Sequence, residues 1–165
     1  MRLPTLLLTS LLYVPLATAN FDIYLASQNL PVDGGAHLTT MWTIFPSDPS
    51  CNDVFNGGYY LDQNDVSGNK IGVRCEGSGC FGGAASDIDI LEMHFTNSPL
   101  YHWTIYKNRG HPYKMYGLDG NTYGECILFP GDDYHCPRGA ETRSGVRKFR
   151  CLTSFTVAQI RAGRP

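Results

Sequence analysis

Hydrophobic and polar residues alternate along much of this chain, and few stretches show the spacing of an amphipathic helix. Short runs rich in β-branched and aromatic residues recur between clusters of Gly, Pro, Asn and Asp. The pattern predicts strands at residues 21–26, 38–45, 59–61, 70–75, 87–95, 101–106, 114–116, 123–129 and 148–157. We therefore expect an all-β protein with little helix, folded as a compact antiparallel β-sandwich or barrel.

The faces of two predicted strands are readable from the sequence. In residues 101–106, Trp103 and Ile105 share one face, so His102 is expected on the opposite, outward face. Near the C-terminus a run of basic residues predicts a solvated strand, with an anionic partner as the alternative. That run consists of Arg143, Arg147, Lys148 and Arg150.

The N-terminal segment has the features of a secretory signal peptide. Arg2 precedes an apolar run, and Ala17-Thr18-Ala19 supplies the small residues that signal peptidase accepts. The apolar run is too short to anchor the chain in a membrane, and we expect no membrane partner. We predict a signal peptide at 1–19 and a single domain at 20–165, secreted to the extracellular space.

All cysteines follow the predicted leader. Their even number in an exported chain predicts three disulfides, and the sequence leaves the pairing open. The spacings do not give the paired C-x2-C knuckles of a zinc site, so we expect no metal and no other cofactor. The disulfide residues are Cys51, Cys75, Cys80, Cys126, Cys136 and Cys151. Together they predict a disulfide-stapled β domain.

No established catalytic motif is present: G-x-S-x-G, H-E-x-x-H and a P-loop are all missing from the sequence. The best catalytic constellation is the segment with His102, Arg109, His111, Tyr113, Glu125 and His135. Within it, His102, Arg109, His111 and Glu125 are the residues expected to act. A carboxylate base, an imidazole acid and a cation beside the phosphate are what metal-independent RNA cleavage requires. Here the chain is similar to small secreted fungal ribonucleases of the guanyl-specific type, although it lacks their N-terminal helix signal. The resemblance implies RNA cleavage, or a ribonuclease-like fold without activity.

A glycine-rich loop is the first candidate for binding a partner. It contains Gly77, Ser78, Gly79 and Phe81 and carries two cysteines. A covalent staple lowers the entropic cost of ordering a loop that enters a partner's cleft. Glycine also permits close backbone approach.

A second candidate is the segment from Leu30 through Val32 to Gly35. It is similar to the Q-x-V-x-G hairpin of cystatin-type cysteine protease inhibitors, with Leu30 in place of the Gln. The chain lacks the Pro-Trp loop and the long helix of that family. We expect an exposed turn with an apolar tip.

Tyrosine is abundant, with 10 in the chain and several crowded between residues 101 and 123. Exposed tyrosines stack on sugar rings, so a glycan-binding lectin is a further alternative.

The chain as a whole resembles small secreted cysteine-containing effector proteins of filamentous fungi. That resemblance implies binding of a host macromolecule outside the fungus rather than catalysis. Our preferred hypothesis is inhibition of a host papain-like cysteine protease in the apoplast, by a monomeric protein. We expect no nucleic-acid partner. The alternatives are the ribonuclease and the lectin.

Overall fold

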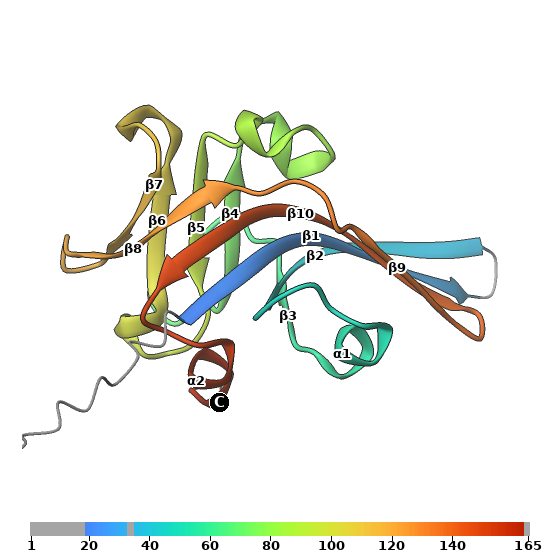
Figure 1. Cartoon of the computed structure of the whole chain (residues 1–165). Coiled ribbons are helices and arrows are strands. Elements are labelled where there is room, and N and C mark those ends of the chain that lie inside the picture. Colours follow the sequence, from blue (N-terminus) through green and yellow to red (C-terminus); the bar gives the residue numbers. More distant parts are fainter. Residues whose placement is uncertain (1–18, 33–34, 164–165) are drawn as a thin grey trace, which may run out of the picture.

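The computed structural model describes residues 19–32 and 35–163 as a small antiparallel β protein (Figure 1). The predicted leader lies outside these residues except for Ala19, which begins the first strand. The strands are β1 (Ala19–Val32), β2 (Gly35–Phe45), β3 (Tyr59–Leu61), β4 (Gly72–Glu76), β5 (Ile90–His94), β6 (His102–Tyr106), β7 (Tyr113–Gly117), β8 (Thr122–Leu128), β9 (Tyr134–Arg138) and β10 (Glu141–Thr153). Helical elements are short: α1 (Cys51–Asn56), α2 (Val157–Ala162) and the 3-10 turns η1 (Ser78–Phe81), η2 (Ala85–Asp87), η3 (Pro99–Tyr101) and η4 (Lys107–Arg109).

Nine of the strands form a nearly closed barrel. They are hydrogen-bonded in the order β3-β2-β1-β10-β8-β7-β6-β5-β4, and every pair of strands is antiparallel. The two ends of this path meet at a parallel bridge between Asp62 and Val73, where the Gln63 amide donates to the Val73 carbonyl at 2.9 Å. The expected all-β architecture is confirmed, and of the two forms considered it is the barrel.

The barrel interior is filled by the residues whose alternation predicted the strands. Phe21 packs against Phe95 and Trp103 at ring-centroid distances of 6.1 and 6.2 Å. Trp42 and Trp103 are both buried. Removing each such side chain from water contributes roughly 2 to 3 kcal/mol, which makes these aromatic residues the main apolar contribution to the core.

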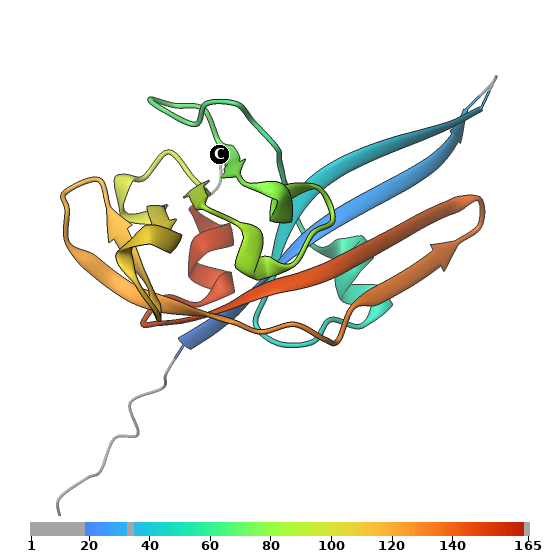
Figure 2. The ribbon, with the colours of Figure 1, turned by 90° about the horizontal axis from the view of Figure 1, so that it is seen from above.

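Four strands continue past the barrel as an arm, which we define as residues 26–32, 35–41 and 134–146. Figures 1 and 2 show the β1–β2 and β9–β10 hairpins projecting from one end of the barrel. One face of the sheet near the base of the arm is covered by α1, where Tyr24, Phe45 and Val54 form a second, smaller apolar cluster with Cys136. The arm is therefore braced on one side only.

The C-terminal part of the chain differs from the prediction. The strand predicted at 148–157 is wrong at both ends, because β10 runs from Glu141 to Thr153 and α2 follows it. The β9–β10 hairpin was not predicted, since the apolar alternation in β9 is limited to Tyr134 and Cys136 and is followed by Pro137. Thr156 is the N-cap of α2 and forms a capping box, in which its side-chain oxygen accepts a hydrogen bond from the backbone amide of Gln159.

The expectation of a solvated basic strand is wrong for its two central residues. The pairing of β1 with β10 shifts between Ile23 and Tyr24, so a bulge changes which face each neighbouring residue occupies. Arg147 is only 3% exposed and pairs with Asp22, Asp48 and Asp132. Lys148 is 1% exposed. Its Nζ donates to the Gly83 carbonyl at 2.6 Å.

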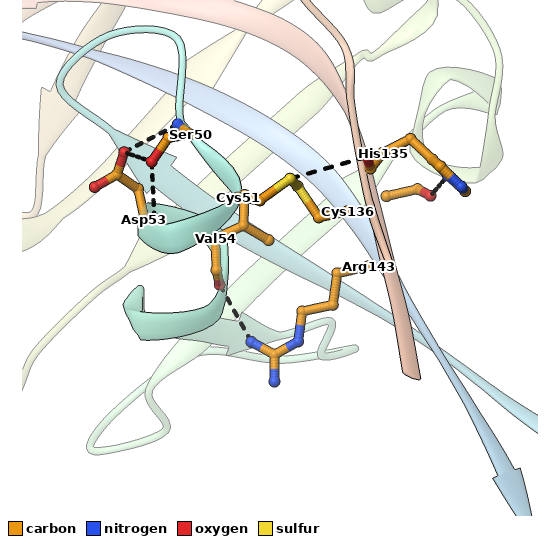
Figure 3. Close-up of a disulfide and its surroundings, with 8 residues drawn as sticks. Ser50, Cys51, Asp53, Val54, His135, Cys136 and Arg143 are labelled. Carbon is orange, nitrogen blue, oxygen red and sulfur yellow. Dashed lines mark hydrogen bonds between the residues drawn. A yellow bond between two sulfur atoms is a disulfide. The ribbon is translucent and has the colours of Figure 1, made fainter. Parts of the chain in front are cut away.

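All six cysteines are paired, as the even count predicted: Cys51 with Cys136, Cys75 with Cys80, and Cys126 with Cys151. The first bond ties α1 to β9 across 85 residues of sequence (Figure 3). The third joins directly opposed residues of β8 and β10. Multiple disulfides are consistent with an extracellular protein. None of the helices in residues 19–32 and 35–163 has the length and hydrophobicity of a transmembrane span.

Candidate functional site

The glycine-rich loop predicted as a binding element is a rigid structure, which we call the Phe81 loop and define as residues 77–83. Gly77 has a φ of +110°, and a Cβ added there would collide with the Asp87 carbonyl. Gly79 is buried against the Ala84 carbonyl and Ile88, so it also has no room for a side chain. The glycines thus allow the loop to pack against its own neighbouring turn, η2.

Three further attachments hold this loop in place. The Cys75–Cys80 disulfide closes it, and the Cys80 side chain belongs to the main apolar core. The buried Lys148 ammonium bonds to the Gly83 carbonyl on the other side of the loop. Burial lowers the pKa of Lys148, since charge is poorly solvated there, and nearby Asp133 and Asp87 partly offset this effect.

Phe81 stands out of this rigid frame with 83% of its surface exposed, the highest value among the large apolar residues the structure describes. Gly82 follows it in the left-handed region, with nothing near the position of its missing Cβ. Ser78 is also exposed, while its carbonyl accepts from the Gly83 amide. The sequence predicted this element, and the structure places its aromatic side chain in solvent on a braced turn.

The second predicted binding segment lies at the end of the arm. Leu30 is 37% exposed and opposes His37 across the β1–β2 hairpin. The side chain of Val32 and the turn that follows it lie outside the described residues. Figures 1 and 2 both show this end of the arm far from η1 and η2. The two predicted elements therefore do not form one binding surface.

The four residues of the ribonuclease hypothesis are divided among three places. His111 and Glu125 line a shared pocket of about 450 Å³ between β7 and β8. Arg109 lies over the rings of Tyr106 and Tyr116, with its guanidinium carbon 4.1 and 4.7 Å from their centroids. His102 lies elsewhere, at the beginning of β6. These four predicted residues therefore do not form one site.

A different cluster, which the sequence did not reveal, surrounds His102. Cross-strand register sets Arg74 opposite Glu92 and His94 opposite His102 on the outer face of β4, β5 and β6. Glu92 accepts from Arg74 Nε at 2.8 Å and lies 2.9 Å from His102 Nε2. The two imidazole rings stack with centroids 4.3 Å apart. Glu92 and His94 lie two residues apart on the same face of β5, but His102 comes close to them only because of the register between β5 and β6.

This cluster is largely covered. His94 Nδ1 lies 2.8 Å from the carbonyl of Val66, whose side chain is fully buried. His102, expected on the outward face, is on that face but only 3% exposed. Burial lowers its pKa, against the opposing effect of Glu92. For Glu92 burial acts to raise the pKa, yet hydrogen bonds from Arg74 and His102 outweigh it and the pKa is lowered.

Most of the tyrosines that suggested the lectin alternative take part in packing or hydrogen bonds within the protein. Tyr113 is buried, and Tyr101 packs edge-on against Trp103. Tyr123 donates a 2.7 Å hydrogen bond to Asp119. Tyr106 and Tyr116 flank Arg109 and keep part of their rings accessible. Glycan binding stays a prediction: of the five tyrosines in residues 101–123 only Tyr113 is buried, and Tyr101 and Tyr123 are partly exposed like Tyr106 and Tyr116.

In the described part of the chain, His, Cys, Asp and Glu side chains form no group that could hold a metal ion. No family model, curated protein or solved structure matches the chain.

Proposed function

We propose that the protein acts outside the cell by binding another protein, and that Phe81 on its braced loop is the principal contact. The observation that carries this proposal is an 83% exposed aromatic side chain on a turn fixed by a disulfide, by Lys148 and by tightly packed glycines. A preorganised aromatic residue loses little entropy when it enters a partner's pocket, and such residues are typical binding hot spots.

The charge around the loop restricts the partner. Residues 76–89 include Glu76, Asp87 and Asp89 and no basic residue. In the structure Glu76 pairs with Arg74 and Asp89 pairs with Lys107, so most of this negative charge is compensated. The fitting partner therefore has an apolar pocket with a largely neutral rim. We take a papain-like cysteine protease of a host as the target class, because the chain resembles fungal effectors and a stapled loop suits insertion into a cleft.

An inhibition assay tests this proposal. The protein without its predicted leader is titrated against papain cleaving a short peptide substrate. We expect slower cleavage at micromolar protein, and Phe81→Ala should weaken inhibition at least about tenfold, equivalent to about 1.4 kcal/mol. Leu118→Ala, at a 66% exposed leucine in the β7–β8 turn, should inhibit like the wild type. Unchanged cleavage at micromolar protein, or equal effects of both substitutions, would reject the proposal.

RNA cleavage remains the second candidate, supported by the cluster around Glu92. A carboxylate bonded to His102 and Arg74 supplies a base, an acid and a cation within one hydrogen-bonded group. Tyr116 lies on the same face, since Glu92 opposes Thr104 and Thr104 opposes Tyr116. Because His102 is only 3% exposed, a substrate can reach it only after the residues that cover it move.

The ribonuclease candidate predicts degradation of single-stranded RNA in the presence of a chelator. Glu92→Gln should abolish that activity, whereas Glu125→Gln, at the originally predicted carboxylate, should preserve it. RNA that stays intact at high protein concentration would exclude the candidate.

A further inference from the structure

The outer edge of β2 is open along the arm. β2 begins at Gly35, but its neighbour β3 pairs only with Met41, Trp42 and Thr43. Among the residues that the structure describes, no strand pairs with this edge before Met41. About half of the strand length thus leaves backbone donors and acceptors that another strand can satisfy.

The opposite edge of the arm is protected, which makes the β2 edge distinctive. β9 is short and contains Pro137, a residue that lacks a backbone donor. The Cys51–Cys136 disulfide joins α1 to this strand, and Arg143 reaches across to the Val54 carbonyl at 3.2 Å (Figure 3). Proline, covering helices and charges are the usual protections of an edge strand. Residues 37–40 of β2 contain no proline, lysine, arginine or acidic residue.

The open segment is suited to pairing with itself. Residues 37–40 are His37, Leu38, Thr39 and Thr40, without an acidic residue, lysine or arginine. Leu38 is 67% exposed. An antiparallel two-fold axis at Leu38 places this leucine beside its own copy and His37 opposite Thr39 of the second chain. Such a contact is isologous, so it closes at two copies and does not propagate.

We propose that two copies of the protein associate through this edge of β2. The two arms then lie side by side in opposite directions, and their sheets join across the new strand pair. Because the arm projects from one end of the barrel (Figures 1 and 2), the two barrels are at opposite ends of the joined sheet. Because this contact consists of one short pair of strands, we expect a weak dimer, with a Kd in the micromolar range.

Sedimentation analysis of the leaderless protein from about 1 to about 500 µM tests the proposal. The average mass should rise from one chain toward two. Leu38→Lys sets two ammonium groups across the two-fold axis and should raise the dimer Kd at least tenfold. Leu118→Lys places the same charge on an exposed leucine outside the arm and should leave the Kd unchanged.

Three results would overturn it: a wild type that stays monomeric throughout, a Leu38→Lys variant that still dimerises, or equal losses in both variants. Both leucines are exposed, and circular dichroism verifies that the variants fold. Papain inhibition by Leu38→Lys should equal that of the wild type, so failure of the dimer and failure of the Phe81 contact are separable. The monomer expected from the sequence is the opposite outcome of this test.

Discussion

The Phe81 loop and the arm are both exposed and both were predicted as contact elements, yet they are stabilised in different ways. The loop is closed by Cys75–Cys80, bonded to Lys148 and packed on the core through Cys80. The arm depends on strand pairing, with α1 and one disulfide bracing a single side. A rigid turn can present one side chain, whereas an open strand edge presents its backbone. The loop is therefore suited to a side-chain contact with a partner, and the arm to a contact that extends its β-sheet.

Removing disulfides gives the largest expected difference between the two regions. Chain-entropy arguments assign up to about 4.5 kcal/mol to the Cys51–Cys136 bond, which spans 85 residues, and about 2 kcal/mol to Cys75–Cys80, which spans 5. Urea unfolding of the two double alanine variants measures both losses. The arm variant should lose more stability but keep inhibition, while the loop variant should lose inhibition. Loss of inhibition in the arm variant, with inhibition kept by the loop variant, would contradict this difference between the two regions.

The next largest effect is expected near the base of the arm, at Asp22. This carboxylate is fully buried, and Arg150 Nε donates to it at 2.6 Å while Arg147 Nη1 lies 3.1 Å away. Removing one partner from a buried ionic cluster costs about 3 kcal/mol, so Asp22→Ala should lower the unfolding free energy by that amount.

Asp65→Ala is the matched control for Asp22→Ala. Asp65 pairs with Lys70 at the surface, where both side chains are more than half exposed. An exposed pair of this kind contributes less than about 1 kcal/mol. Equal losses in the two variants would mean that the buried cluster does not brace the arm.

Acid should weaken the barrel wall independently of both contact elements. Burial in the folded state, with His94 stacked beside it, lowers the pKa of His102 against the opposing effect of Glu92, so the unfolded chain binds this proton more readily. Its contribution to stability is therefore complete above its ordinary pKa of about 6.5 and is lost as the pH falls through the lower folded value. Glu92, whose pKa is also lowered, adds a further loss at more acidic pH.

Urea midpoints at pH 7.5 and 5.5 measure this loss. The midpoint of the wild type should be lower at pH 5.5. His102→Gln should reduce the difference, and His111→Gln, at an exposed histidine, should not. A urea midpoint that is higher at pH 5.5 than at pH 7.5 would contradict the predicted direction of the pH dependence.

Phe81→Ala should have the smallest effect on stability. A side chain that is 83% exposed adds little to folding, so the unfolding free energy should change by less than about 0.5 kcal/mol. Phe149→Ala, at a fully buried phenylalanine, should cost about 3 to 5 kcal/mol. Comparable losses would mean that Phe81 serves the core and is not free to bind.

Much of the barrel could be predicted, because alternation identifies faces without any knowledge of partners. Trp103 and Ile105 lie inside the barrel and His102 lies on the other face, as their positions in the strand indicate. The even number of cysteines likewise predicted complete pairing. The local sequence pattern was therefore sufficient for features that depend on a single strand, such as the face on which a side chain lies.

The rest depends on contacts between distant residues. The bulge at Lys148, opposite Ile23 and Tyr24 of β1, has no signature in the sequence of β10 alone, and neither has the burial of Arg147 and Lys148. The meeting of Glu92 with His102 depends on hairpin register, and disulfide pairing depends on the complete topology. These features were missed because the residues that make them are far apart in the chain or lie on different strands.

Hydrogen–deuterium exchange followed by mass spectrometry tests the central contrast most directly. The amides of Cys80, Gly83, Ile88 and Asp89 donate to backbone carbonyls, at 2.8 to 3.3 Å. At dilute protein, peptides covering 77–89 should exchange slowly, and peptides covering 35–40 of β2 should exchange faster. Adding papain should protect only the first region further. Rapid exchange throughout 77–89, with protection on papain binding confined to the arm, would contradict the account.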